Sequence, residues 1–495
     1  MKADKMAKEL TKWISNAIDK NSKTKKVIVK KIFEITDLMV PIENDRSGNP
    51  WKKFFKAFSS MKNNAVRNEE IGITNQQFKE NLEGKLLGFP NVDLKLTKKF
   101  IDQITINWKK NEKLNLHTDS REIRDIIVKF SASGAKDISD LCVKELKMLK
   151  DQNNVLDAIS ILWNKMVNEN VWPIILKHDR IVYIFKNKGE RFDPSKYRPI
   201  TIVNGISKIF EELLRRRISI HLPDVAKGLN HAYKIGLNCQ TAVFDVDQFI
   251  KDKELGWHSC AIFIDLRGAY ESVEHRIIKY LIQKKSDTLA NLTHQYVAGR
   301  KASITNNISR KEDVILNYRK NRSIPQGSIV SPWVFRQYCG LFSKWLTDTI
   351  TLSDDSTTRL VGYADDHVII VNAKSIDIAL NTAIKYVEKF KRICECLGVA
   401  FAPEKTEILL EEEKDVWVMG NCIRTSNLIV WLGYSLVLNR KSNVEFAIQN
   451  KKKFTLVNNV ETYCRLNSRL EDRKLMYMMY IKCVTIRWFT FHRYY

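Results

Sequence analysis

Tyr363-Ala364-Asp365-Asp366 is the stretch on which the interpretation of this chain depends, because its two carboxylates stand between two apolar runs, 360–362 and 368–371. An apolar run, a two-residue turn and a second apolar run predict a β-hairpin with the acids at its tip. Two adjacent carboxylates at the rim of a core repel each other unless a cation is present. Aspartate also suits turns for local reasons, so the tetrapeptide indicates either a plain turn or part of a metal site.

A third acid favours the metal site. Asp265 follows the apolar segment 261–264, which predicts a buried strand. If this strand and the hairpin belong to one sheet, Asp265, Asp365 and Asp366 converge at one edge. Carboxylate oxygens suit Mg²⁺, which binds through carboxylates and substrate phosphates. Two ions about 3.5–4 Å apart can activate a 3′-hydroxyl and stabilise the leaving pyrophosphate, which is nucleotidyl transfer.

The charge balance indicates a polyanionic partner. The 495 residues include 82 Lys+Arg against 57 Asp+Glu, which gives a formal net charge of +25, and the excess is spread along the whole length. A basic solvated surface is the plain alternative, but an excess of this size is typical of nucleic-acid binding. The length is enough for two or three domains.

Several classes of protein are excluded by pattern. The nine cysteines include no Cys-x-x-Cys pair, and the closest pair, Cys394 and Cys396, has no ligand at zinc-finger spacing. This argues against a zinc site and a disulfide framework and favours a reducing compartment. No apolar run reaches 18 residues, so no membrane partner is expected. The lysine-rich N-terminus lacks an apolar core and fits neither a secretory nor a transit peptide.

Six motifs occur in one uninterrupted order between about residues 120 and 440. They are Tyr197-Arg198-Pro199-Ile200 with Lys208-Ile209-Phe210-Glu211, Phe263-Ile264-Asp265 with Ala269-Tyr270, Pro325-Gln326-Gly327 with Ser331-Pro332, Tyr363-Ala364-Asp365-Asp366, Lys405-Thr406-Glu407, and Trp431-Leu432-Gly433. This order resembles the palm motifs of reverse transcriptases, and in particular those of non-LTR (LINE-type) retrotransposons. The resemblance implies an RNA-directed DNA polymerase that transfers nucleotides from dNTPs to a primer 3′-hydroxyl.

The implied fold is α+β, a right-hand polymerase of fingers, palm with an antiparallel sheet, and thumb, with a helical N-terminal extension. We expect a basic extension over 1–105, a fingers-like region over 106–255, the palm with its catalytic motifs and primer grip over 256–440, and a short helical thumb over 441–495. Within the palm, Ser331-Pro332 predicts an N-cap followed by Pro at the first position of a helix over 333–348.

The resemblance also implies catalytic roles. Asp265 and Asp365 would bind two Mg²⁺ ions, with Mn²⁺ as an alternative, and Asp366 would assist. Lys405 is the candidate general acid that protonates pyrophosphate. His367 is expected to be a residue of the hairpin face and not a ligand.

A second group of residues would bind the incoming dNTP. Arg198 suits bidentate phosphate contact, and Lys186 or Lys188 would supply a point charge. For the two lysines, a solvated basic loop is the plain alternative. The ring of Tyr270 would form the floor of the sugar pocket and exclude a 2′-hydroxyl.

Two further motifs would contact the nucleic acid. Gln326 and Gly327 would line the nascent base pair, since Gly allows close backbone approach. Trp431, Leu432 and Gly433 would form the primer grip.

The chain departs from the family pattern at two places. The turn over 131–138 lacks the usual Pro-Gly-x-Asp-Gly run, although Asp137 could still serve there. Ala402 stands where the family usually has Asn, which removes a polar contact beside the site.

The expected partners are an RNA template, a DNA primer and dNTPs. A nuclease domain is not expected within the chain, so a separately encoded endonuclease is a further expected partner of a solitary or truncated polymerase. The resemblance suggests synthesis in the cytoplasm and action in the nucleus. The alternatives are a decayed or domesticated retroelement protein that only binds nucleic acid, and, more weakly, a group II intron maturase. Retention of Asp265, Asp365, Asp366, Tyr270 and Gln326 favours the enzyme.

Overall fold

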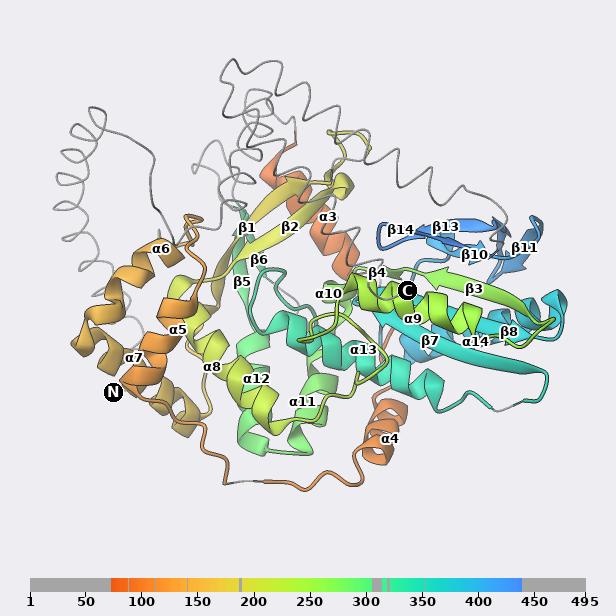
Figure 1. Ribbon diagram of the computed structural model, residues 1–495. Coiled ribbons are helices and arrows are strands. Elements are labelled where there is room, and N and C mark those ends of the chain that lie inside the picture. The colour runs from red at the N-terminus through yellow and green to blue at the C-terminus, as the bar shows by residue number, and fades with distance from the viewer. Residues whose placement is uncertain are drawn as a thin grey trace, which may run out of the picture. The chain divides into compact units, whose positions relative to one another are not determined.

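The computed structural model describes residues 73–438, apart from 88, 112, 140, 187–188, 305–313, 318–320 and 352. These residues fall into two compact units (Figure 1). The first unit takes the described residues up to Gly228 together with Leu266–Trp345 and Lys391–Phe401. The second takes Leu229–Asp265, Leu346–Phe390 and the described residues from Ala402 onward. Most of the expected N-terminal extension and the whole expected thumb lie outside the described residues.

The first unit combines helices with a mixed sheet. Its helices are α3 (Asn75–Leu87), α4 (Leu94–Ile104), α5 (Ser120–Lys129), α6 (Val143–Leu146), α7 (Asn153–Glu169), α8 (Gly205–His221), α10 (Ala269–Ser272), α11 (His275–Gln283), α12 (Asp287–Val297) and nearly all of α13 (Ser331–Thr347). Its strands are β1 (His178–Phe185), β2 (Tyr197–Ile202), β4 (Leu266–Arg267), β5 (Lys301–Ile304), β6 (Val314–Asn317) and β9 (Ala400–Phe401). The main sheet has the order β2-β1-β5-β6, in which only the β1–β5 pair is parallel.

Helix α3 is part of the core of this sheet, although it precedes β1 by 90 residues of chain. Phe78 stacks on Tyr183 with 3.9 Å between ring centroids, and its edge meets Tyr197 at 5.2 Å. Ile73 and Leu82 are buried in the same cluster. The helix therefore covers a face of the β2-β1-β5-β6 sheet with its apolar side.

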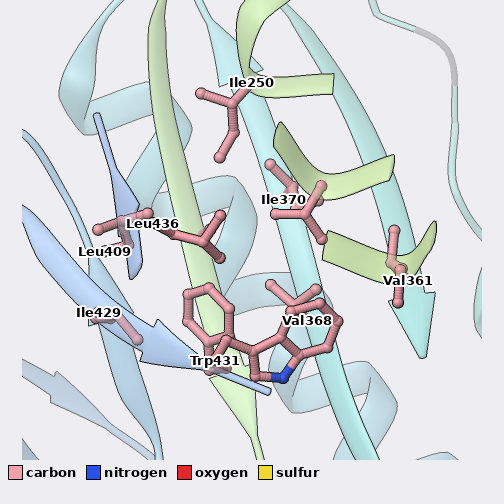
Figure 2. Close-up of a cluster of buried hydrophobic side chains, with 12 residues drawn as sticks. Ile250, Val361, Val368, Ile370, Leu409, Ile429, Trp431 and Leu436 are labelled. Carbon is pink, nitrogen blue, oxygen red and sulfur yellow. The ribbon is translucent and has the colours of Figure 1, made fainter. Parts of the chain in front are cut away.

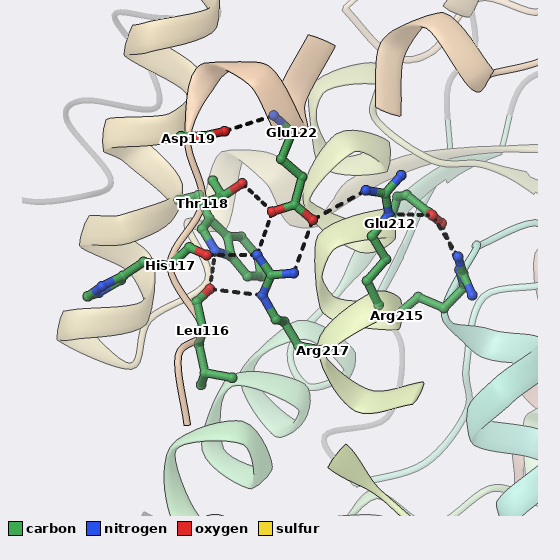
Figure 3. Close-up of polar contacts among 10 residues, drawn as sticks. Leu116, His117, Thr118, Asp119, Glu122, Glu212, Arg215 and Arg217 are labelled. Carbon is green, nitrogen blue, oxygen red and sulfur yellow. Dashed lines mark hydrogen bonds and ion pairs between the residues drawn. The ribbon is translucent and has the colours of Figure 1, made fainter. Parts of the chain in front are cut away.

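The arginines at the end of α8 are bound by acids of the protein itself (Figure 3). Glu122 of α5 accepts hydrogen bonds from Arg217 at 2.6 and 3.0 Å and from Arg216 at 3.3 Å. Glu212 accepts from Arg215 at 2.6 and 2.7 Å. Burial opposes ionisation of Glu122, but the bonds from Arg217, Thr118 and Arg216 outweigh it and lower its pKa. This basic run therefore joins α5 to α8.

The second unit is built on an antiparallel sheet of order β10-β3-β8-β7. Its strands are β3 (His258–Ile264), β7 (Ser356–Tyr363), β8 (Asp366–Ala373) and β10 (Glu407–Leu409). Two hairpins follow, β11 (Asp415–Val418) with β12 (Asn421–Arg424), and β13 (Leu428–Trp431) with β14 (Tyr434–Val437). The helices are α9 (Cys239–Lys251) and most of α14 (Ile376–Cys396). The expected hairpin is confirmed, and so is its place in one sheet with the strand before Asp265. The α+β class is confirmed for the described residues.

One face of this sheet holds the apolar cluster of Figure 2. Ile250 comes from α9, Val368 and Ile370 from β8, and Trp431 from the β13–β14 hairpin. Trp431 lies 5.8 Å from Phe263 of β3, measured between ring centroids. Asp365 lies directly before β8 and Asp366 is its first residue, and the residues of β8 that follow, 367–373, are buried.

Candidate active site

The register of β3 and β8 brings the three predicted acids together. Ile264 pairs with His367, so the next step of the antiparallel ladder sets Asp265 opposite Asp366. Burial raises the pKa of Asp366 to about 7, and the charges of Asp365 and Asp265 add to this, while Lys405 opposes it. Burial and the two neighbouring carboxylates therefore both favour the protonated form of Asp366 when no cation is bound.

Lys405 reaches this cluster from a short 3₁₀ turn, Pro403–Lys405, and forms an ion pair with the Asp265 carboxylate. The Lys405 side chain is 59% exposed, so solvent can reach its ammonium group. The neighbouring Ala402 donates its amide to the Asp265 carbonyl at 3.1 Å. The backbone of Ala402 thus supports Asp265, although its side chain offers no polar contact.

The turn of the hairpin has an uncommon backbone. Tyr363 pairs with Asp366, which leaves Ala364 and Asp365 as the two turn residues, and Ala364 has φ of 54°. The buried Asn230 side chain bonds the Ala364 backbone in both directions. Sequence reasoning missed Asn230, because a single Asn 134 residues upstream carries no pattern that links it to the turn.

His367 behaves as expected from the sequence, as a residue of the hairpin face. It is fully buried, and its Nδ1 lies 3.0 Å from the Asp365 carbonyl oxygen. Burial lowers the pKa of His367 to about 4, so the ring is neutral at physiological pH.

The donor set suits a hard divalent cation. The three carboxylates supply oxygen ligands only, and the charges of Asp365 and Asp265 add to the burial that raises the pKa of Asp366, a repulsion that a cation would relieve. In the described part of the chain, no three His, Cys, Asp or Glu side chains are already placed around one metal position. Instead, Lys405 lies against Asp265.

The residues predicted for nucleotide binding lie in the first unit. Tyr270 of α10 stacks on Phe335 of α13, with 4.9 Å between ring centroids. Gln326 donates its side-chain amide to Glu271 at 3.1 Å, and its carbonyl accepts the Thr201 amide at 2.6 Å. The structure thus brings the Pro325-Gln326-Gly327 loop against β2, the strand that carries Arg198.

Arg198 and Lys186 lie on the β1–β2 ladder, and both are exposed. Arg198 pairs with Ile184, and the Lys186 amide continues the ladder by bonding the Lys196 carbonyl at 2.8 Å. The Lys186 ammonium donates to the Ser195 carbonyl at 2.8 Å. Lys188 lies outside the described residues.

A buried polar network behind the loop was missed by sequence reasoning. Glu211 of α8 accepts from the Ile329 amide at 2.8 Å and from the Tyr296 hydroxyl at 2.7 Å. Tyr296 also bonds Ser328, whose hydroxyl accepts the Val330 and Ser331 amides. Helix α13 begins at Ser331, so Ser331 is already helical and the prediction that it is the N-cap is wrong. In the described residues the Ser331 hydroxyl has no hydrogen-bond partner.

Two further candidates, the 432–433 turn and Asp137, lie where they shape the backbone of the protein. Leu432 and Gly433 form the two-residue turn of the β13–β14 hairpin, with φ of 50° and 83°, the signs of a type I′ turn. Asp137 is buried and accepts the Gly205, Leu141 and Ser139 amides at 2.6 to 3.0 Å. It therefore joins its loop to the start of α8.

In the described ranges, no helix is both long enough and apolar enough to cross a membrane.

Residues 177–436, more than half of the chain, match the family model described as "Reverse transcriptase (RNA-dependent DNA polymerase)". The curated proteins that are similar to this chain match it over a smaller share of their own length than of this chain. The "RNA-directed DNA polymerase from mobile element jockey" of Drosophila melanogaster is 23% identical over 300 residues, 57% of this chain and 31% of the relative. The "Probable RNA-directed DNA polymerase from transposon X-element" of the same species is 25% identical over 225 residues, 44% of this chain and 24% of the relative. The "Putative COX1/OXI3 intron 1 protein" of Saccharomyces cerevisiae is 24% identical over 199 residues, 40% of this chain and 22% of the relative.

Proposed function

The chain belongs to the reverse transcriptase (RNA-dependent DNA polymerase) family, and from this premise we propose that it copies an RNA template into DNA. It would join dNTPs to a primer 3′-hydroxyl, as a polymerase of the non-LTR retrotransposon type. The observation that carries the proposal is the β3–β8 register, which gathers Asp265, Asp365 and Asp366 beside Lys405. A protein that only binds nucleic acid has no need of three carboxylates gathered in this way.

In the proposed right-hand arrangement, the β10-β3-β8-β7 sheet is the palm. The β1–β2 pair would belong to the fingers-like region over 106–255, β5 and β6 would lie in the palm range over 256–440, and the thumb would take 441–495. The β13–β14 hairpin would be the primer grip, and the contact of Trp431 with Phe263 of β3 supports this role because it attaches the hairpin to the proposed palm sheet.

Asp265 and Asp365, with Asp366 assisting, would hold two Mg²⁺ ions, or Mn²⁺. When bound, such ions lower the pKa of the primer hydroxyl and neutralise charge on the phosphates. Lys405 would leave Asp265 when that carboxylate is neutralised and would donate a proton to the departing pyrophosphate. Its exposure and its position beside Asp265 support this role.

The nucleotide would be oriented by residues of the first unit. Arg198, with Lys186 or Lys188, would bind the triphosphate, since Arg forms paired bonds with phosphate oxygens. Tyr270, held by its stack on Phe335, would close the space that a 2′-hydroxyl requires. Gln326 and Gly327 would line the base pair, and the Thr201, Glu271 and Ser328 contacts keep their loop in place.

The proposed partners are an RNA template, a DNA primer and dNTPs, with action in the nucleus after cytoplasmic synthesis. A separately encoded endonuclease would supply the primer end. The chain spans 31% and 24% of the lengths of the jockey and X-element proteins, so these partners rest on the family and not on the whole length of those relatives.

Primer extension tests the proposal. The full chain is incubated with a primed RNA template, Mg²⁺ and four dNTPs, and the products are resolved by length. We expect template-directed extension by the wild type and its loss in Asp265→Asn, a variant of equal size. Extension that is equal in the two proteins, or absent from the wild type while it binds the duplex, would support the decayed nucleic-acid-binding alternative instead.

A further inference from the structure

A short segment, Leu229–Ala232, pairs with strand β7 near its end, at Gly362, beside the hairpin that carries the acids. The Gly362 amide donates to the Leu229 carbonyl at 2.9 Å, and the His231 amide donates to the Gly362 carbonyl at 2.8 Å. These two bonds form a parallel bridge between Asn230 and Gly362. The segment is therefore held one residue away from the turn that carries Asp365.

The Asn230 side chain completes this attachment at the turn itself. Its Oδ1 accepts the Ala364 amide at 3.1 Å, and its Nδ2 donates to the Ala364 carbonyl at 3.0 Å. The residue is only 1% exposed, so both bonds are shielded from water. A carboxamide that meets the amide and the carbonyl of one residue fixes the plane on each side of its Cα.

We call the two bonds from the Asn230 side chain to the Ala364 backbone the clamp, and Ala364 has a backbone conformation that requires such bonds. Ala364 has φ of 54°, a left-handed conformation that residues other than Gly adopt rarely. Such a conformation persists only where its surroundings impose it. The direction of the Asp365 side chain follows from the backbone of Ala364, since the two residues make up the whole turn.

A purely local role does not account for Asn230. Its Oδ1 also accepts the Ala232 amide at 3.0 Å, and this bond alone would suffice for a turn within its own segment. The bonds to Ala364 join residues that are 134 positions apart in the chain. One of them uses the Nδ2 group as donor, and a turn within the segment itself would not need that donor. Gly362 keeps room for them, because an added Cβ would lie 2.8 Å from Asn230 Nδ2.

The segment is itself anchored to helix α9. His231 Nδ1 lies 2.9 Å from the Thr241 hydroxyl, and its Nε2 lies 3.4 Å from Asp245. Asp245 in turn pairs with Arg359 of β7 at 2.7 Å. The clamp is therefore attached to the same sheet that carries the acids, through α9 as well as through Gly362.

We propose that Asn230 is a positioning residue for nucleotidyl transfer, whose carboxamide holds Ala364 in the left-handed conformation and so sets Asp365 toward Asp265 and Asp366. This inference rests on the proposed polymerase function. Without the clamp, Ala364 relaxes to negative φ and the Asp365 carboxylate leaves the cluster. The cluster then binds divalent cations more weakly, and the chemical step slows.

The test compares Asn230→Ala with a matched control, Asn372→Ala, in the full chain. Asn372 is also buried, lies at the other end of β8, donates to the Phe249 carbonyl at 2.7 Å and accepts from Ser259 at 2.8 Å. Three quantities are measured: Tm, kcat and KM for dNTP in primer extension, and the affinity for Mn²⁺ alone by electron paramagnetic resonance. Both variants should lose stability, because each loses buried hydrogen bonds.

The expected difference lies in the other two readouts. Asn230→Ala should lower kcat by about ten- to a hundredfold with little change in KM, as misplaced catalytic groups do. It should also weaken Mn²⁺ binding, whereas Asn372→Ala should leave kcat and Mn²⁺ affinity near the wild-type values. Equal behaviour of the two variants, or wild-type kcat and Mn²⁺ affinity in Asn230→Ala, would overturn the proposal.

A second comparison keeps the test decisive if Asn230→Ala folds poorly. Gly adopts positive φ freely, so Ala364→Gly should recover part of the kcat and Mn²⁺ affinity lost by Asn230→Ala when the two are combined. Absence of such coupling contradicts the clamp. If the wild type does not polymerise, the proposed function fails by itself. The Mn²⁺ affinities of the wild type, Asn230→Ala, Asn372→Ala and the combined Asn230→Ala/Ala364→Gly variant then still decide whether Asn230 positions Asp365.

Discussion

A Cβ added at Gly327 would lie 2.2 Å from the carbonyl oxygen of Thr201, so this loop touches strand β2 with no room for a side chain. Gly327 also has φ of 129°, which L-residues rarely adopt. The sequence predicted that Gly allows close backbone approach at this place, and in the structure the neighbour is β2. The loop that would line the nascent base pair is thereby tied to the strand of Arg198.

Gly327→Ala should accordingly push the loop away from β2. We expect a loss of about 2 kcal/mol in the free energy of unfolding, as strained positive-φ sites give, and a raised KM for dNTP. Gly256→Ala is the matched control, because Gly256 has φ of 82° and open space around its Cα. If only backbone strain matters, the two variants lose equal stability and neither changes KM.

The stack of Tyr270 on Phe335 leads to a prediction about sugar selection. Tyr270→Val should raise ribonucleotide incorporation by about ten- to a hundredfold relative to dNTPs, because the ring no longer fills the space of a 2′-hydroxyl. Tyr270→Phe keeps the ring and the stack and should keep the selection. The measurement is the ratio of kcat/KM for one dNTP and its rNTP, and an unchanged ratio in Tyr270→Val would remove Tyr270 from the sugar pocket.

Lys405 offers a test of the proton donor. Lys405→Met should lower kcat by about a hundredfold if the ammonium protonates pyrophosphate, whereas Lys405→Arg retains the charge beside Asp265 but donates a proton poorly and should recover little. Single-turnover extension across pH 6–9 separates the two effects. Full recovery by Arg would show that Lys405 serves Asp265 as a counter-charge only.

The raised pKa of Asp366 predicts a pH dependence of stability in the absence of divalent cations. An unfolded Asp releases its proton near pH 4, whereas folded Asp366 holds it up to about pH 7. Between these values the folded state binds more protons, so the free energy of unfolding falls as pH rises. The fall should be about 2 kcal/mol after allowance for solvent screening.

Urea unfolding in EDTA, at steps from pH 4.5 to 7.5, measures this effect. Asp366→Asn should flatten the profile in that window, since an amide does not titrate. Mg²⁺ should also flatten the wild-type profile, because a bound cation favours the ionised carboxylate. A wild-type profile that rises with pH in EDTA over the same window would contradict the assignment.

Local pattern predicted the hairpin, because apolar runs and turn residues determine it. Its place in one sheet with the strand before Asp265 followed only from the hypothesis that the three acids converge, and the β3–β8 register confirms it. The same logic placed a helix after Pro332 but chose the wrong cap. The Ser328 hydroxyl accepts the Ser331 amide just ahead of the helix, and Ser328 is itself bonded by Tyr296, which is distant in the chain. Asn230 and the contacts of Glu211 escaped prediction for the same reason, since each residue acts through partners more than 80 residues away. A single polar residue has no period by which to find such partners.

Helix α3 has a practical consequence for how the molecule is divided. Homology to the family begins at residue 177, yet Phe78 covers Tyr183 and Tyr197 of the sheet within the matched segment. A fragment cut at the edge of the homology would leave those rings in water and invite aggregation. The segment that matches the family is therefore shorter than the segment that forms this core. An expressed fragment should begin ahead of Ile73, which lies in the same core.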